Sequence, residues 1–321
     1  MDNKQPKITS SSLESSKFVG GEKWQRQLCT WDEIKRKFGI DDSRYREFSF
    51  LKFLDISDPF VQNYVGYQIG KSDPIIKGRL SSHINYWLDL NPPEWLLSVI
   101  KDGVKIPFNK EPPQIILPNN KSSVERENIE WIRETLREYL KFGFIKKVIL
   151  PPKVISPLQV SVHSTGKKCL IHDESVLNEF IEKQKFKLEG WEEMLQYCGG
   201  SNFGIQFDMK KFYYEIDIDP DYQKYFGFMY PMEDGLESTY FVWTVLPYGY
   251  TRAPYLARSL MKPLIAKWRR LGILVVVFYD DGMAVSSSES FLSKASTQIQ
   301  CDLLRCGLFP GFEKCNWTPA L

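Results

Sequence analysis

The sequence predicts an α+β fold, and three kinds of stretch support this prediction. Residues 273–287 (ILVVVFYDDGMAVSS) place two apolar runs on either side of Asp-Asp-Gly, a pattern typical of a β-hairpin. Residues 203–208 form a second strand-like run that ends in a carboxylate. Apolar residues recur at helical spacing over 122–144, 253–271 and 288–306. A small antiparallel sheet flanked by helices accounts for all three.

Composition restricts the class of protein. The chain has 321 residues, 43% of them hydrophobic and 26% charged, which predicts a folded protein of more than one lobe. Its net charge is only +2, so a nucleic-acid-binding surface would have to be local. No apolar stretch resembles a signal peptide or a membrane span. We therefore expect no membrane partner.

The cysteines indicate a compartment. They lack the spacing of a zinc site or a CxxC pair, and we expect reduced thiols in an intracellular protein of the cytoplasm or nucleus. The six cysteines are at positions 29, 169, 198, 301, 306 and 315.

The first 121 residues divide into two predicted parts. Residues 1–20 are expected to be a disordered tail, because the stretch is polar and rich in serine. Residues 21–121 are expected to form a largely helical N-terminal extension. Its predicted helices cover 31–38 and 79–100, and Pro92-Pro93 splits the second into two pieces.

Residues 122–202 are predicted to combine a long helix with a hairpin. The helix over 122–144 would be capped by Ser122 or Ser123 and end at Gly143. Extended runs at 155–163 and 169–172 flank a turn, which places Lys167 and Lys168 at a basic tip. These two cations would suit a triphosphate, although a lysine-tipped hairpin is also a common solvated turn.

Three carboxylates carry the predicted chemistry. Asp208 ends a strand, and Asp280 and Asp281 are predicted to lie with Gly282 at the hairpin turn. If these strands are neighbours, the carboxylates converge and would hold two divalent ions, Mg²⁺ or Mn²⁺, about 4 Å apart for phosphoryl transfer. The simpler alternative is an ordinary hairpin, since Asp-Gly is a frequent turn sequence.

The order of these motifs resembles that of a reverse transcriptase, and in detail the DIRS-like class of retrotransposons. The segment 278–281 (FYDD) resembles the family's aromatic-x-Asp-Asp signature, and 207–210 (FDMK) its first catalytic motif. The loop 246–254 (LPYGYTRAP) resembles its Leu-Pro-Phe-Gly loop, and 307–315 its Gly…Lys-Ser segment. Upstream, Gly78-Arg79-Leu80, Trp87, Ile106-Pro107-Phe108 and Pro112-Pro113 resemble the region that DIRS-like elements carry before the polymerase.

The resemblance implies an RNA-directed DNA polymerase with fingers at 122–202 and a palm at 203–321. A primer 3′-hydroxyl would attack a dNTP on an RNA or DNA template. In this family the roles fall on matching positions: metal ligands at Asp208, Asp280 and Asp281, a gate against the 2′-hydroxyl at Tyr213, nucleotide and template contacts at Tyr248 and Gly249, and a proton donor to pyrophosphate at Lys314.

Departures from the family pattern motivate a second hypothesis. Cys169 stands where the family has a triphosphate-binding arginine, and Phe212 replaces an alanine beside the gate. No segment resembling a thumb or RNase H is expected in this sequence. The alternative is therefore a truncated, non-catalytic nucleic-acid-binding relic or a recruited palm scaffold. A metal-dependent nuclease is a weaker third reading, because it gives the gate and the Leu-Pro loop no purpose.

Other conspicuous residues are open to two readings. The basic cluster Lys262, Lys267, Arg269 and Arg270 is either a solvated helix face or a nucleic-acid track. We expect Trp87 and Trp95 to pack in the core instead of serving as platforms for bases. His172 is expected to be structural.

Overall fold

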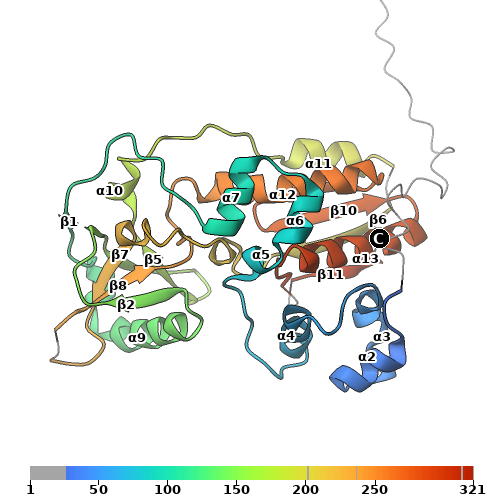
Figure 1. Ribbon diagram of the computed structural model, residues 1–321, viewed down its shortest axis with the longest axis horizontal. Coiled ribbons are helices and arrows are strands. Elements are labelled where there is room, and N and C mark those ends of the chain that lie inside the picture. Colours follow the sequence, from blue (N-terminus) through green and yellow to red (C-terminus); the bar gives the residue numbers. More distant parts are fainter. Residues whose placement is uncertain (1–26, 201, 236, 312–313, 321) are drawn as a thin grey trace, which may run out of the picture.

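Two sheets and a separate hairpin organise the molecule (Figure 1). The computed structural model describes residues 27–200, 202–235, 237–311 and 314–320, so the predicted tail over 1–20 lies outside the described residues. One sheet has five strands in the order β1-β3-β7-β8-β2, and the other has four in the order β11-β6-β10-β9. The predicted mixture of helices and sheet is confirmed.

The four-stranded sheet contains the predicted hairpin and the strand that ends in Asp208. Its central strand β6 pairs antiparallel with both β10 and β11. Helices α12 and α13 pack on the face from which Phe207 projects, and the Phe207 ring meets Trp268 of α12 edge-on at 6.1 Å. The elements are β6 (Phe203–Asp208), β9 (Leu274–Phe278), β10 (Asp281–Ser286), β11 (Asn316–Ala320), α12 (Ala253–Arg270) and α13 (Glu289–Arg305).

The five-stranded sheet draws on segments far apart in the chain. Its strands are β1 (Ile115–Ile116), β2 (Ile145–Val148), β3 (Val154–Ile155), β7 (Gly227–Tyr230) and β8 (Thr239–Trp243). Strands β7 and β8 come from the segment 203–321, yet they pair with β3 and β2. Stacking of Phe228 on Phe241 at 5.1 Å supports this pairing. The basic-tipped hairpin forms as predicted, with β4 (Leu158–Val162) and β5 (Lys168–His172).

The predicted helix over 122–144 is two helices, α8 (Lys121–Val124) and α9 (Arg126–Lys141). Glu125 breaks the chain between them with an extended backbone, φ −65° and ψ 132°. The predicted cap by Ser122 or Ser123 is therefore wrong for the long helix. The Ser122 hydroxyl instead accepts a hydrogen bond from the Val160 amide at 3.0 Å, which ties α8 to the hairpin. Two short helices follow, α10 (Ser175–Asn178) and α11 (Trp191–Cys198).

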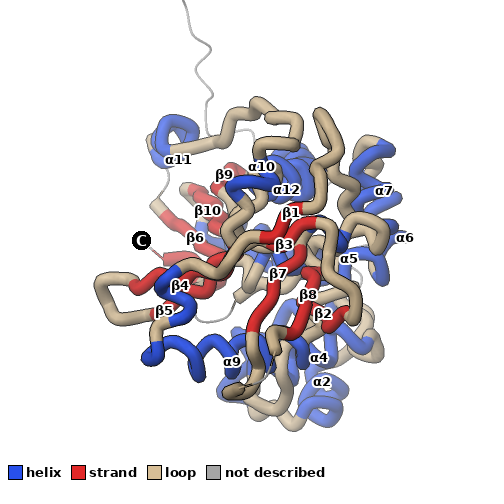
Figure 2. Tube along the Cα trace, turned by 90° about the vertical axis from the view of Figure 1, so that its left-hand side faces the viewer, coloured by secondary structure: helices blue, strands red, loops and turns tan. Residues whose placement is uncertain are grey.

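The described part of the predicted extension, residues 27–121, is mainly helical. Thr30 and Glu33 form a capping box that starts α2 at the predicted residue. Pro92-Pro93 separates α6 from α7, and Asn91 takes the left-handed conformation before them. Figure 2 shows α6 and α7 on one side of the molecule and α2 and α4 below. The helices are α2 (Trp31–Phe38), α3 (Tyr45–Phe48), α4 (Pro59–Gln68), α5 (Arg79–Ser82), α6 (Ile84–Leu90) and α7 (Glu94–Asp102).

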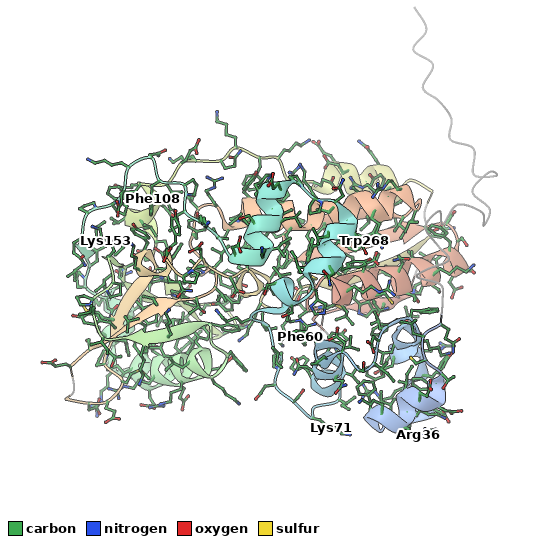
Figure 3. All side chains as sticks on the ribbon, viewed as in Figure 1. Arg36, Phe60, Lys71, Phe108, Lys153 and Trp268 are labelled. Carbon is green, nitrogen blue, oxygen red and sulfur yellow. The ribbon has the colours of Figure 1, made fainter. Side chains whose placement is uncertain are left out.

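Asp302, on α13, is a buried carboxylate that joins the extension to the helices behind the sheet. Its Oδ1 accepts from the Tyr86 hydroxyl at 2.6 Å and from Lys267 Nζ at 2.9 Å. Its Oδ2 accepts from Trp268 Nε1 at 2.9 Å, and Gln298 donates to Oδ1 at 2.7 Å. Trp268 is fully buried, and Figure 3 shows it among the helices in the upper part of the molecule. Lys267 of the predicted basic cluster therefore has a structural partner.

Trp87 provides a second link, because its indole N–H donates to the carbonyl of Cys306 at 2.9 Å. Trp87 is fully buried, as predicted, whereas the prediction for Trp95 is wrong because 43% of its surface is exposed. Among the described residues, no helix is long and apolar enough to cross a bilayer.

Replacing Asp302 by alanine should destabilise the protein strongly. The change leaves the buried Trp268 N–H without its acceptor and removes the carboxylate that pairs with Lys267, whose ammonium keeps the Tyr86 hydroxyl as a partner. We expect a loss of roughly 3 kcal/mol in the free energy of unfolding. Urea denaturation followed by tryptophan fluorescence measures it. Asp89→Ala, at an exposed position on α6, is the control and should stay within about 0.5 kcal/mol of wild type. Equal losses in both variants would show that Asp302 does not hold the extension in place.

Candidate active site

The register of two neighbouring strands brings the predicted carboxylates together. Asp208, the last residue of β6, lies directly opposite Asp281, the first residue of β10. Directly opposed residues of an antiparallel pair have Cβ atoms about 5 Å apart. The carbonyl of Asp280 accepts a hydrogen bond from the Met209 amide at 2.9 Å, which continues the pairing past the strand ends. Both strands therefore deliver their carboxylates to one corner of the sheet.

The hairpin turn differs by one residue from the prediction. Phe278 pairs with Asp281, so the loop consists of Tyr279 and Asp280, and Asp281 and Gly282 already belong to β10. Tyr279 has a φ of 57°. This left-handed conformation costs a tyrosine on the order of 1 kcal/mol or more, and such strain is concentrated at functional sites.

Gly282 is required by a close approach and not by the turn. A Cβ atom at this position would lie 2.1 Å from the Phe207 ring of the opposite strand. The same ring stacks on Trp317 of β11 at 5.5 Å with an interplanar angle of 6°. The ring thus crosses the β10 backbone and holds the register that opposes the two aspartates.

Burial and repulsion between carboxylates disfavour the charged forms of Asp280 and Asp281. Asp208 is 6% exposed. Burial, followed by repulsion from Asp208 and Asp281, raises the pKa of Asp280. Burial and repulsion from Asp208 likewise raise the pKa of Asp281. The negative charge at this corner exceeds what the surrounding groups compensate, and a bound cation would reduce the repulsion.

Lys314 supplies part of that compensation. Its Nζ lies 2.9 Å from Oδ2 of Asp208, and this hydrogen bond raises the pKa of Lys314. The adjoining segment encloses Asp208 further. The Gly311 amide donates to the Asp208 carbonyl at 2.6 Å, and the Asp208 amide lies 3.3 Å from Sγ of Cys315. Sequence reasoning did not identify Gly311, although a Cβ there would lie 3.0 Å from Oδ1 of Asp208.

Tyr213 and Tyr248 lie together beside the carboxylates, with ring centroids 4.9 Å apart. Burial, and then the charge of Asp280, raises the pKa of Tyr213 to about 12. Burial also raises the pKa of Tyr248. Both phenols therefore stay protonated near neutral pH and can donate a hydrogen bond. Phe212, by contrast, is 1% exposed and belongs to the hydrophobic core.

Gly249 follows Tyr248 at a point where the loop touches the end of β5. With a φ of 117°, its Cα approaches His172 so closely that a Cβ would lie 2.7 Å from the His172 carbonyl oxygen. The side chain of Asn178 donates to the Gly249 carbonyl at 2.8 Å and accepts from the Thr251 amide at 2.9 Å. This amide bridge fixes the loop that carries Tyr248.

Lys167 and Lys168, the two cations predicted to contact a triphosphate, lie in different environments. Lys168 Nζ turns toward α9, where it donates to Oδ1 of Asn128 at 2.6 Å and to the Glu127 carbonyl at 3.2 Å. Lys167 is exposed near the tip of the hairpin, and Cys169 is also exposed. His172 is structural in the sense predicted, since its Nδ1 lies 2.6 Å from Oε1 of Glu174 and both side chains are fully buried.

Comparison with known proteins identifies the family. Residues 160–320 match the family model described as reverse transcriptase (RNA-dependent DNA polymerase). The chain belongs to the reverse transcriptase family. The matched segment runs from the β4–β5 hairpin to the end of β11 and contains every predicted site residue.

Similarity to viral proteins extends further toward the N-terminus. The chain is 22% identical over 287 residues to the genome polyprotein of Petunia vein clearing virus, which covers 88% of this chain and 12% of the polyprotein. It is 23% identical over 276 residues to the Gag-Pro-Pol polyprotein of Bovine leukemia virus (84% and 19%). It is 26% identical over 193 residues to the Pol polyprotein of Equine infectious anemia virus (59% and 16%). The chain thus spans less than a fifth of the length of these relatives.

Members of this family generally use divalent metal ions, and the donor set of this reverse transcriptase domain suits them. Three carboxylates offer the hard oxygen ligands that Mg²⁺ and Mn²⁺ prefer. The raised pKa values of Asp280 and Asp281 reflect a repulsion that an ion would relieve. Within the described ranges, no three His, Cys, Asp or Glu side chains surround a common metal position. Asp208 is instead paired with Lys314.

Behind the site lies a buried carboxylate that sequence reasoning missed. Glu215 is fully buried, and its Oε1 accepts from the Phe309 amide at 2.9 Å. Burial outweighs this hydrogen bond and the charge of Arg79, and raises the pKa of Glu215 to about 8. Arg79 is itself fully buried between the rings of Phe60 and Phe309 and donates to the Gly307 carbonyl at 2.9 Å.

Glu215 should make stability depend on pH. Its pKa is about 8 in the folded chain against an ordinary value of 4.5, so folding takes up a proton between these values. The contribution of this proton to the free energy of unfolding is complete below about pH 4.5 and is lost as the pH rises through 8. The free energy of unfolding falls by no more than about 1.4 kcal/mol per pH unit on this account. Urea unfolding of wild type and Glu215→Gln from pH 5.5 to 8.5 should give curves that diverge, with wild type losing stability relative to the variant. Parallel curves would show that Glu215 does not bind this proton.

Proposed function

We propose that this chain is the RNA-directed DNA polymerase domain of a retrotransposon. It would extend a primer by transferring a nucleotide from a dNTP to the 3′-hydroxyl, on an RNA or DNA template. The observation that carries the proposal is the opposition of Asp208 and Asp281 across β6 and β10, with Asp280 adjacent. Membership of the reverse transcriptase family supports the same reaction.

Asp208, Asp280 and Asp281 would hold the two divalent ions. Such ions, when bound, activate an attacking hydroxyl and neutralise a leaving pyrophosphate. Lys314 carries a proton on Nζ within 2.9 Å of Asp208. In the proposed reaction this ammonium ion would leave its ion pair when the carboxylate binds metal, and would donate its proton to the pyrophosphate.

The two tyrosines would shape the nucleotide pocket. The ring of Tyr213 would exclude a 2′-hydroxyl, and its packing against Tyr248, with ring centroids 4.9 Å apart, would hold it in position. The Asn178 bridge to Gly249 and Thr251 holds the Tyr248 loop in position. Lys167, exposed on the hairpin, would be the cation that reaches the triphosphate, and Lys168 would join it only by leaving Asn128.

The proposal also covers the class of retrotransposon, the division of the chain into domains and the cellular compartment. Assignment to the DIRS-like class is supported by the upstream motif residues Arg79 and Trp87, both fully buried against the segment around Gly307. The proposed division places an extension at 21–121, fingers at 122–202 and a palm at 203–321. Six free cysteines suit an intracellular site of synthesis, in the cytoplasm or nucleus.

A non-catalytic, nucleic-acid-binding palm is the second candidate. It is supported by the exposed thiol of Cys169 where the family has an arginine, and by the contact of Lys168 with α9. Such a protein would bind a template–primer without extending it. One assay separates the two candidates.

Primer extension on poly-rA with oligo-dT, in Mg²⁺ and in Mn²⁺, tests the proposal. We expect DNA synthesis by the wild-type chain. Asp208→Asn and Asp280→Asn should each reduce the rate at least about 1,000-fold, because metal-held charge stabilisation is worth several kcal/mol in the transition state.

The matched control is Asp221→Asn, which removes one exposed carboxylate on the segment that follows the site. It should retain the wild-type rate. Extension that survives in the double variant Asp208→Asn/Asp280→Asn would refute the assignment. Template–primer binding by wild type with no extension in either metal would favour the non-catalytic palm.

A further inference from the structure

A stripe of cations runs along the outer face of α12. Arg258, Lys262 and Arg270 are separated by multiples of four residues, with Ala266 completing the series. Successive members of such a series are neighbours on the helix surface, and the series as a whole winds slowly around the helix. At 1.5 Å per residue, the stripe is about 18 Å long. It lines a groove of about 660 Å³ between α12 and the Leu90–Pro93 turn of the extension.

The cations of the stripe have no ion-pair partner within the described chain. Glu189 is the one carboxylate among the described residues that line the groove, and it is committed to Arg269 by two hydrogen bonds of 2.8 and 2.5 Å. No ion pair or hydrogen bond joins Arg258, Lys262 or Arg270 to another described side chain. Like charges four residues apart destabilise a helix, so an anion from outside would stabilise this face.

A stacked aromatic pair, of which Trp95 is exposed and Tyr255 half-buried, continues the stripe at one end. Tyr255 lies one turn before Arg258 on α12, and Trp95 lies two residues beyond Pro93 of the groove. Their rings stack with centroids 5.8 Å apart and an interplanar angle of 13°. Trp95 nevertheless keeps 43% of its surface exposed. Arg252 adds a cation over the Tyr255 ring at 5.6 Å.

We propose that this face of α12 binds a single-stranded nucleic acid, with the sugar-phosphate backbone along the cations and a base stacked on Trp95. A cationic groove combined with an aromatic platform is the arrangement that binds single strands without sequence preference. An acidic peptide would use the cations but would give the exposed indole no partner, so the single strand fits better. The site goes beyond the proposed polymerase activity, because it lies outside the corner that holds the aspartates.

The arrangement of elements supports a separate track. In Figure 2 the helices α6 and α7, whose connecting turn forms one wall of the groove, lie on the opposite side of the molecule from the β4–β5 hairpin. A strand bound there would occupy the surface of the extension and α12. A template engaged with the aspartates would therefore be held at a second point, in a groove that none of the three aspartates lines.

Fluorescence anisotropy with a labelled 20-nucleotide oligo-rU, in EDTA to prevent turnover, tests the proposal. The variant Arg258→Gln/Lys262→Gln/Arg270→Gln should bind about tenfold or more weakly. Its slope of log affinity against log salt should be shallower by about 2, since each phosphate contact contributes about 0.7 for a single strand. Trp95→Ala should weaken binding about fivefold or more.

The matched control is Arg36→Gln/Lys37→Gln/Lys110→Gln, which removes three exposed cations elsewhere. Arg36 lies on α2, at the lower right of the view in Figure 3, whereas α12 crosses the upper middle in the same view (Figure 1). The control should keep wild-type affinity and salt slope, and circular dichroism should show all variants folded. Equal affinity of the stripe variant and the control would overturn the proposal. So would stripe-dependent binding of a poly-glutamate peptide with no stripe-dependent binding of RNA.

Two further readouts separate this proposal from the polymerase assignment. Ultraviolet cross-linking of 4-thiouridine RNA should label a peptide that contains Trp95 or Tyr255, and absence of that label would count against the track. The stripe variant should extend a short hairpin template–primer at the wild-type rate. If no variant extends a primer, the polymerase assignment fails while the binding result still decides the track.

Discussion

The antiparallel pairing of β6 with β10 is the constraint on which the site depends. Side chains alternate between the faces of a sheet, so a slip of one residue would move every side chain of a strand to the other face. In the observed register Asp208 opposes Asp281, and Phe207 opposes Gly282. The second pair protects the first, because the Phe207 ring lies over position 282 and leaves no room for a side chain there. The strand register that this contact fixes therefore also fixes the relative position of the carboxylates.

The extension is part of this architecture. Asp302 collects hydrogen bonds from Tyr86 of the extension and from Lys267 and Trp268 of α12. Removing a buried carboxylate that accepts hydrogen bonds from several donors strongly destabilises the folded protein, because the donors lose their partner. Arg79 acts similarly nearer the site, where it reaches Gly307 and lies close to Glu215. The helices before residue 121 thus brace the back of the sheet that carries the aspartates.

Local signals in the sequence predicted much of this structure. The strand over 203–208, the Asp-Asp hairpin and the helices over 253–271 and 288–306 form within a residue or two of their expected ends. Their apolar spacing and turn residues depend on neighbours along the chain. The proximity of Asp208 to the hairpin was also predicted, from motif order, and Lys314 lies against Asp208.

Features set by long-range contacts were not predictable in this way. Strands β2 and β11 are short and gain their pairing from segments roughly 100 residues away. The helix break at Glu125 and the turn of Lys168 toward Asn128 depend on packing between α9 and the hairpin. The exposure of Trp95 could not be predicted, because it depends on Tyr255, a residue far away in the sequence, covering only one face of the indole ring. Glu215 gave no signal because its role depends on burial.

Binding of Mn²⁺, followed by electron paramagnetic resonance, tests most directly whether the paired strands form a metal centre. Wild-type protein should bind Mn²⁺, and Mg²⁺ should displace it. Asp208→Asn/Asp281→Asn should lose most of this binding, because it removes the two carboxylates that the strand register opposes. Unchanged Mn²⁺ binding by that variant would contradict the account.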